Sequence, residues 1–171
     1  MRGVHRPSVL YRRCMHATLR PWGPDDEPFL WEMLYRAIHV PPGHAPPPRS
    51  ILDEHKIAHH LTEFGAREGD DAVIACDGGA QVGAAFCRRF SEADPSYGFV
   101  SADVPEVGIA VVTGFQGKGI GRSMLDYLLE RYPTMSLSVD SDNHRARTLY
   151  ESLGFVEAHL DGTSVTMIRR P

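Results

Sequence analysis

The sequence predicts an α+β domain built on one mixed, mostly antiparallel sheet. Most of the predicted strands follow one another through turns, which is typical of antiparallel neighbours. One late unit differs, because it runs from a strand through a glycine-rich loop and a helix to the next strand, over residues 104–140. The 171 residues contain no internal repeat and no linker long enough to separate two domains. This order of elements indicates a single mixed domain.

The individual elements follow from apolar periodicity and from residues that start or stop helices and strands. Before the glycine loop we expect strand 16–22, a helix capped by Asp25 and Asp26 that stops before Pro41, a helix capped by Ser50 that ends near residue 63, a hairpin turning at residues 77–79, and strands 97–102 and 104–112. After it we expect a helix from Ile120 to Pro133, strand 135–140, helix 143–153 ended by Gly154, and a hairpin turning at Asp161 and Gly162. Five prolines make residues 40–50 a stiff loop.

Composition and charge exclude several classes of protein. Hydrophobic residues make up 42% of the chain and charged residues 23%, as in an ordinary globular protein. A net charge of −4 argues against a nucleic-acid partner. No apolar run approaches the length of a membrane span. The three cysteines are odd in number and lack metal-binding spacing, which fits a reducing, cytoplasmic setting.

The first residues differ from the rest of the chain. Residues 1–14 are basic but lack the apolar stretch of a signal peptide. Met15 is an alternative start to Met1. We therefore expect residues 1–14 to be a disordered extension and residues 15–171 to form the domain.

Three closely spaced glycines carry the chemical signal. Gly117, Gly119 and Gly121 stand between the apolar strand 104–112 and an amphipathic helix. Glycine leaves the backbone N–H groups uncovered, and the first N–H groups of a helix have no internal partner. The helix dipole also favours negative charge at this end. The stretch is therefore predicted to bind a phosphate group.

Two common phosphate motifs fit poorly. A P-loop needs Lys and Ser or Thr directly after its last glycine, and this chain has Ile120 and Gly121 after Gly119. A dinucleotide site is closer, since Asp140 ends the next strand where a ribose-binding acid belongs. However, Met124 occupies the position of the third glycine, and the chain has no room for a six-stranded sheet.

A third pattern uses more of the residues. The stretch Gln116-Gly-Lys-Gly-Ile-Gly121 resembles the Q/R-x-x-G-x-G/A acyl-CoA signature of the GNAT superfamily of N-acetyltransferases. Downstream, Asn143-x-x-Ala146-x-x-x-Tyr150 and the LGF sequence at 153–155 resemble a second pattern of that family. The resemblance covers about residues 16–170, with Gly114 where a proline is common. Together the two patterns are far more specific than the glycines alone.

This resemblance implies a fold and a coenzyme site. The sheet would carry helices on both faces, and strand 104–112 would splay from its neighbour to open a coenzyme cleft. The pyrophosphate of acetyl-CoA would bind backbone N–H groups of the glycine loop, and pantetheine would pair with the strand edge. The implied coenzyme-binding residues are Ala110, Val111, Val112, Gln116, Gly117, Lys118, Gly119, Ile120, Gly121, Arg122 and Asn143.

Two residues are candidates for catalysis, each with a simpler explanation. In the family the tyrosine at the position of Tyr150 protonates the departing thiolate, yet Tyr150 also belongs to an apolar helix stripe and can be a core residue. Glu106 shares a strand face with Gly108 and Ala110, so it can take the proton of the attacking amine. It can equally be a solvated acid at the start of a strand.

Other polar residues are explained by structure as readily as by function. Asn143 suits a helix N-cap as well as a coenzyme contact. Lys118 and Arg122 can hold phosphate or remain exposed at a helix start. His55 and His59 have the i, i+4 spacing of metal ligands, but no third ligand is evident in the sequence. We therefore expect no metal.

The predicted function is that of an acetyl-CoA-dependent N-acetyltransferase. The acetyl group would pass directly to a primary amine of a small molecule or peptide, since no serine or cysteine stands in a nucleophile motif. The alternative is a non-catalytic module that binds or senses acyl-CoA. Neither nucleic acid nor a membrane is expected as a partner. The sequence leaves open the acceptor, the length of the acyl group and whether the chain forms a homodimer.

Overall fold

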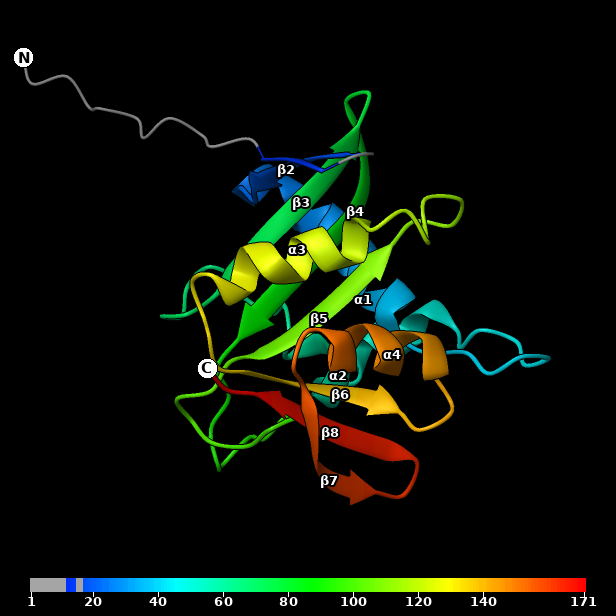
Figure 1. Cartoon of the computed structure of the whole chain (residues 1–171). Coiled ribbons are helices and arrows are strands. Elements are labelled where there is room, and N and C mark those ends of the chain that lie inside the picture. Colours follow the sequence, from blue (N-terminus) through cyan, green and yellow to red (C-terminus); the bar gives the residue numbers. More distant parts are fainter. Residues whose placement is uncertain (1–11, 15–16) are drawn as a thin grey trace, which may run out of the picture.

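The protein folds around one eight-stranded sheet with the spatial order β1-β2-β3-β4-β5-β6-β8-β7 (Figure 1). This computed structural model describes residues 12–14 and 17–171. The strands are β1 (Arg12–Cys14), β2 (Ala17–Pro21), β3 (Asp71–Asp77), β4 (Ala80–Arg88), β5 (Glu106–Val111), β6 (Met135–Asp140), β7 (Val156–Asp161) and β8 (Ser164–Arg169). Among the strands of the described residues, only β5 and β6 pair in parallel. The expected mixed, mostly antiparallel sheet is confirmed.

Helices cover both faces of the sheet. The α-helices are α1 (Glu27–Ala37), α2 (His55–Ala58), α3 (Ile120–Leu129) and α4 (His144–Ser152). Val73 and Ala75 of β3 point into the core that contains α3 and α4, whereas Ala72 and Ile74 point into the core that contains α1. This alternation follows from the two-residue period of a strand. In Figure 1, α3 crosses one side of the sheet and α1 lies on the other.

The sheet opens between its two parallel strands. The two strands pair at Glu106 and Ser136, and Ser136 N–H donates to Pro105 O at 3.0 Å. Farther along, β5 stays paired with β4 as far as Val111. The edge of β5 that faces β6 is therefore open toward the carboxyl end, as the resemblance implied.

Two predicted elements are wrong. Instead of a helix from Ser50 to residue 63, a 3-10 helix at Arg49–Asp53 is followed by the single turn of α2. The backbone of Glu54 is extended and interrupts the helix, and no side chain caps either piece. Residues 97–102 are not a strand but a loop. Its Gly98 N–H donates to a side chain, Glu106, instead of to a neighbouring strand.

At the amino terminus, Arg12–Cys14 pair with Ala17–Leu19 as β1, although they fall in the stretch expected to be disordered. The expectation for residues 1–11 lies outside the described residues. Among the residues that the structure describes, no helix has the length and apolar character needed to cross a bilayer.

Candidate active site

A cleft of about 730 Å³ lies where β5 and β6 separate. Its walls come from the carboxyl end of α1, from Ile109–Val111 of β5, from the glycine loop, from the first turn of α3 and from α4. Thus one cleft joins a strand edge, a helix N-terminus and the helix that carries Tyr150. These are the parts needed to hold an extended ligand with an anionic group at one end.

Most of the residues assigned to coenzyme binding surround this cleft. The lining includes Ala110, Val111, Gln116, Gly117, Gly119, Ile120, Gly121, Arg122 and Asn143. Val112 and Lys118 are not part of it. Val112 packs against the core on the α1 side, and Lys118 Nζ lies 4.9 Å from the centroid of the Phe115 ring.

The glycine loop needs its glycines for backbone reasons. Gly117 and Gly119 have φ angles of 76° and 78°, in the left-handed region that side chains with a Cβ rarely adopt. Gly119 is also the N-cap of α3, with no side chain to satisfy the helix. Among the described residues, the N–H groups of 116–119 donate no backbone hydrogen bond. The loop therefore presents unpaired donors at a helix N-terminus, which suits a phosphate group.

Arginines supply positive charge beside this loop. Arg122 donates to Ser152 Oγ, which ties the start of α3 to α4. A Cβ on Gly117 would lie 3.2 Å from Arg145 Nη2, so this guanidinium sits against the loop. The sequence reasoning missed Arg145, although its place in the Asn143-to-Tyr150 pattern was a usable signal. Together the two arginines complement an anionic ligand.

Tyr150 contributes its side chain to the cleft from α4. The residue is 9% exposed, and its ring centroid lies 5.9 Å from that of Phe155. Burial raises the pKa of its phenol to about 12, so the hydroxyl keeps its proton at any physiological pH. Tyr150 is therefore both a core residue and a proton-bearing group at the cleft.

Glu106 is not a solvated acid. It is 5% exposed, and its Oε2 accepts hydrogen bonds from Ser96 Oγ and, at 3.0 Å, from Gly98 N. Burial raises the pKa of this carboxyl to about 7, although the two hydrogen bonds act in the opposite direction. The carboxylate lies beneath the 96–98 loop and does not line the cleft.

His39 lines the cleft and was missed. It follows α1, and its Nε2 lies 3.1 Å from Asp142 Oδ1, which precedes α4. The contact links the segment after α1 to the loop before α4. Nothing in the local sequence marks His39, because its partner is about a hundred positions away.

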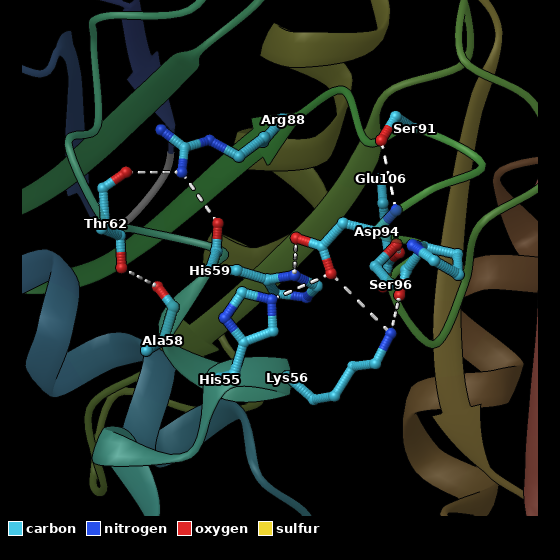
Figure 2. Close-up of polar contacts among 11 residues, drawn as sticks. His55, Lys56, Ala58, His59, Thr62, Arg88, Ser91, Asp94, Ser96 and Glu106 are labelled. Atoms are coloured by element: carbon cyan, nitrogen blue, oxygen red, sulfur yellow. Dashed lines mark hydrogen bonds and ion pairs between the residues drawn. The ribbon is translucent and has the colours of Figure 1, made fainter.

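The third partner for His55 and His59, which was not evident in the sequence, is Asp94 (Figure 2). It comes from the loop after β4 and contacts both imidazoles. This cluster lies outside the cleft.

Comparisons with known proteins agree with this architecture. The Acetyltransferase (GNAT) family matches residues 27–155. The ribosomal-protein-alanine N-acetyltransferase of Brucella melitensis superposes with a TM-score of 0.64 at 19% identity, over 90% of this chain and 99% of that one. The yncA protein of Salmonella typhimurium, solved with its cofactor acetyl-CoA, gives a TM-score of 0.64 at 18% identity, over 90% and 93%. The GNAT domain of S. lividans PAT gives 0.63 at 20% identity, over 89% of each chain. No curated protein matches the chain.

Proposed function

The chain belongs to the GNAT acetyltransferase family, and we propose that it transfers an acetyl group from acetyl-CoA to a primary amine of a small molecule or peptide. One observation carries this proposal. A single cleft combines an unpaired glycine loop, an open strand edge and the hydroxyl-bearing side chain of Tyr150. Bound acetyl-CoA would supply an activated acetyl thioester there.

The residues of the cleft fit the coenzyme part by part. The unpaired N–H groups of the glycine loop would receive the pyrophosphate, with Arg122 and Arg145 adding positive charge. The backbone of Ala110 and Val111 offers an open edge for the amide groups of pantetheine, in the manner of an added strand. Asn143 caps α4 by accepting Ala146 N–H at 3.2 Å, and so it shapes the wall between these two parts.

We propose that Tyr150 donates to the sulfur as the carbon–sulfur bond breaks. Its raised pKa keeps the hydroxyl protonated, which a donor requires. A free thiol has a pKa of about 8.5, so complete transfer of the proton from a phenol near 12 is uphill. The supported role is therefore a hydrogen bond that strengthens as negative charge develops on sulfur.

We propose Glu106 as the group that finally accepts the proton of the amine. A carboxyl with a pKa of about 7 is matched to base catalysis near neutral pH. Because Glu106 lies outside the cleft lining, the proton would travel through the Ser96 hydroxyl or through water. His39 is the rival base, since it lines the cleft directly.

The protein is proposed to work in the cytoplasm, consistent with Cys76 and Cys87 being free thiols. The competing function is a module that binds acyl-CoA without catalysis. Thiol release from acetyl-CoA, measured across small amines, amino acids and peptides with free N-termini, decides between the two. The enzyme proposal expects amine-dependent release with at least one acceptor class. Tight coenzyme binding with no release for any acceptor supports the sensing module instead.

A further inference from the structure

Three side chains that are distant in the sequence meet beside α2, away from the cleft. His55 and His59 lie one helical turn apart, and Asp94 comes from the loop after β4 (Figure 2). His55 Nε2 is 2.9 Å from Asp94 Oδ1, and His59 Nδ1 is 3.2 Å from Asp94 Oδ2. The three potential ligand atoms all lie within 4.8 Å of one another. Two imidazole nitrogens thus lie against one carboxylate, each beside a different oxygen.

We propose that His55, His59 and Asp94 bind one divalent transition-metal ion, with Zn²⁺ as the first candidate. Imidazole nitrogen suits Zn²⁺ and its neighbours in the first transition series. Bonds of about 2.0–2.2 Å in a tetrahedral site place neighbouring ligand atoms roughly 3.4 Å apart. The two nitrogen–oxygen contacts, at 2.9 and 3.2 Å, involve different oxygens of Asp94 and are each slightly shorter than that separation. The His55 side chain is 71% exposed and can rotate to complete the site, and water can take the fourth position.

The surroundings of His59 favour this arrangement. The residue is 2% exposed, its Nε2 has no hydrogen-bond partner among the described residues, and its ring packs against those of Phe90 and His60 at centroid distances of 4.6 and 5.0 Å. With the proton on Nδ1, the lone pair of Nε2 would be buried without a donor. With the proton on Nε2, the lone pair lies instead on Nδ1, the nitrogen that faces Asp94.

The second tautomer leaves a problem that a cation solves. The Nδ1 lone pair of His59 then faces a carboxylate oxygen of Asp94 at 3.2 Å, and the two repel each other. A metal ion between the nitrogen and the oxygen is attracted to both. Neutral imidazole and ionised carboxylate are also the forms that bind metals.

The backbone at Asp94 and His59 is held in place before any ion binds. Asp94 N–H lies 3.1 Å from Ser91 O and 3.2 Å from Ser91 Oγ, and the backbone carbonyl of His59 accepts from the buried Arg88 at 2.8 Å. Both backbone anchors appear in Figure 2. Because the backbone at two of the three ligands is already anchored, binding has mainly the His55 side chain to order, which limits the loss of conformational entropy.

Lys56 places a positive charge beside the Asp94 carboxylate and so opposes a bound cation. Its Nζ lies 4.0 Å from Asp94 Oδ1 and donates to the Pro95 carbonyl. In Figure 2 it reaches the carboxylate from a different side than the imidazoles, so it leaves the proposed position open. Its charge should nevertheless weaken metal binding. This gives a test that a purely hydrogen-bonded cluster would not pass, since loss of the Lys56 charge should tighten metal binding.

The test is calorimetric titration of the full-length, tag-free protein with ZnCl₂ after treatment with a chelator. We expect one equivalent to bind and to raise the melting temperature. His55→Ala and Asp94→Asn should each weaken binding by at least about 100-fold, the upper end of what loss of a merely orienting group costs. Lys56→Gln should bind more tightly than the wild type. His159→Ala, which removes an exposed histidine of β7, is the matched control and should bind normally.

Melting curves without metal verify that each variant is folded, which is expected because His55 is exposed. The proposal is overturned if the wild type binds no Zn²⁺ at micromolar concentrations, or if His55→Ala and Asp94→Asn bind as well as the control. It is also overturned if the Co²⁺-loaded protein shows thiolate-to-metal absorption, because the ion would then be at a cysteine. None of these measurements depends on the proposed enzymatic activity.

Discussion

The two ends of β5 carry two polar sites that the sequence encodes in different ways. At the carboxyl end, the cleft takes most of its walls from residues 109–150, a strand, a loop and two helices that follow one another. At the amino end, Glu106, Ser96, Asp94 and the two histidines come from three separate segments. Most residues of the first site belong to one continuous stretch of sequence with a recognisable motif. The residues of the second site are distant in the sequence and meet only in the folded protein.

The difference extends to their physical character. The cleft is an open space with unpaired backbone donors, so its residues should act mainly on ligand binding. The groups at the amino end are paired with one another, and Glu106 and His59 are almost fully buried. Burial shifts the pKa of both, so these residues should act mainly on pH dependence and stability. Four predictions test whether the two sites separate in this way.

The largest effect is expected from Gly121→Asp at the carboxyl end. A carboxylate beside a bound pyrophosphate costs about 4 kcal/mol per pair of unit charges 4 Å apart at an effective dielectric constant of 20, or about 10³-fold in affinity. A Cβ at this position meets its nearest neighbour, Leu149 Cδ2, at 3.6 Å, an ordinary contact, so the fold should survive. Calorimetry with coenzyme A measures the loss. Gly121→Ala is the control and should bind the coenzyme; equal affinity in the two variants would refute a pyrophosphate site here.

The second effect concerns the hydroxyl of Tyr150. Tyr150→Phe keeps the ring and its packing, so coenzyme affinity should change little while turnover falls by roughly 10²-fold. Tyr127→Phe is the matched control, because Tyr127 is also buried but its hydroxyl accepts from Arg131 at 2.7 Å, away from the cleft. Steady-state kinetics and a thermal melt on each variant separate a loss of turnover from a loss of stability. Normal turnover in Tyr150→Phe would reduce Tyr150 to a core residue.

The comparison also explains how much the sequence could predict. The stripe of Ile120, Met124 and Leu125 on α3 and the Asn143 cap are local features, and the structure has both. The helix expected from Ser50 was wrong because the extended backbone at Glu54 breaks it, which no short-range pattern indicated. The burial of Glu106 also escaped prediction. It depends on a loop at 96–98 that folds over the strand, and that loop was itself predicted to be a strand.

A third prediction decides which residue accepts the proton. Glu106→Gln should reduce turnover by roughly ten- to 100-fold near pH 7, where most of the amine is protonated. The deficit should shrink as the pH approaches the pKa of the amine, about 10 for a lysine-like acceptor. In the wild type, the plot of turnover against pH should have an inflection near pH 7 that reports ionisation of the Glu106 carboxyl. This inflection should be absent from the Glu106→Gln profile.

His39→Gln is the informative comparison for this experiment. If the pH inflection and the loss of turnover follow His39 while Glu106→Gln behaves as the wild type, the base lies in the cleft and the amino end of β5 has no catalytic role. Coenzyme affinity, measured on the same samples, should be unchanged in both variants if they affect only proton transfer.

The smallest effect is on stability, and it requires no substrate. An ordinary glutamate has a pKa of 4.5 and the folded-state pKa of Glu106 is about 7, so the native state holds this proton more tightly than the unfolded state. Glu106 therefore favours folding at acidic pH relative to alkaline pH, and that advantage is lost as the pH rises from about 4.5 through 7.

Glu106→Gln cannot ionise, and its amide oxygen can still accept from Ser96 and Gly98. The variant should thus gain roughly 1–3 kcal/mol of unfolding free energy relative to the wild type between pH 5 and pH 8. Urea unfolding at both pH values measures this difference. A parallel pH dependence in the two proteins would mean that Glu106 is ionised at little cost in the folded state, and the buried, proton-holding amino end of β5 would then no longer contrast with the open cleft.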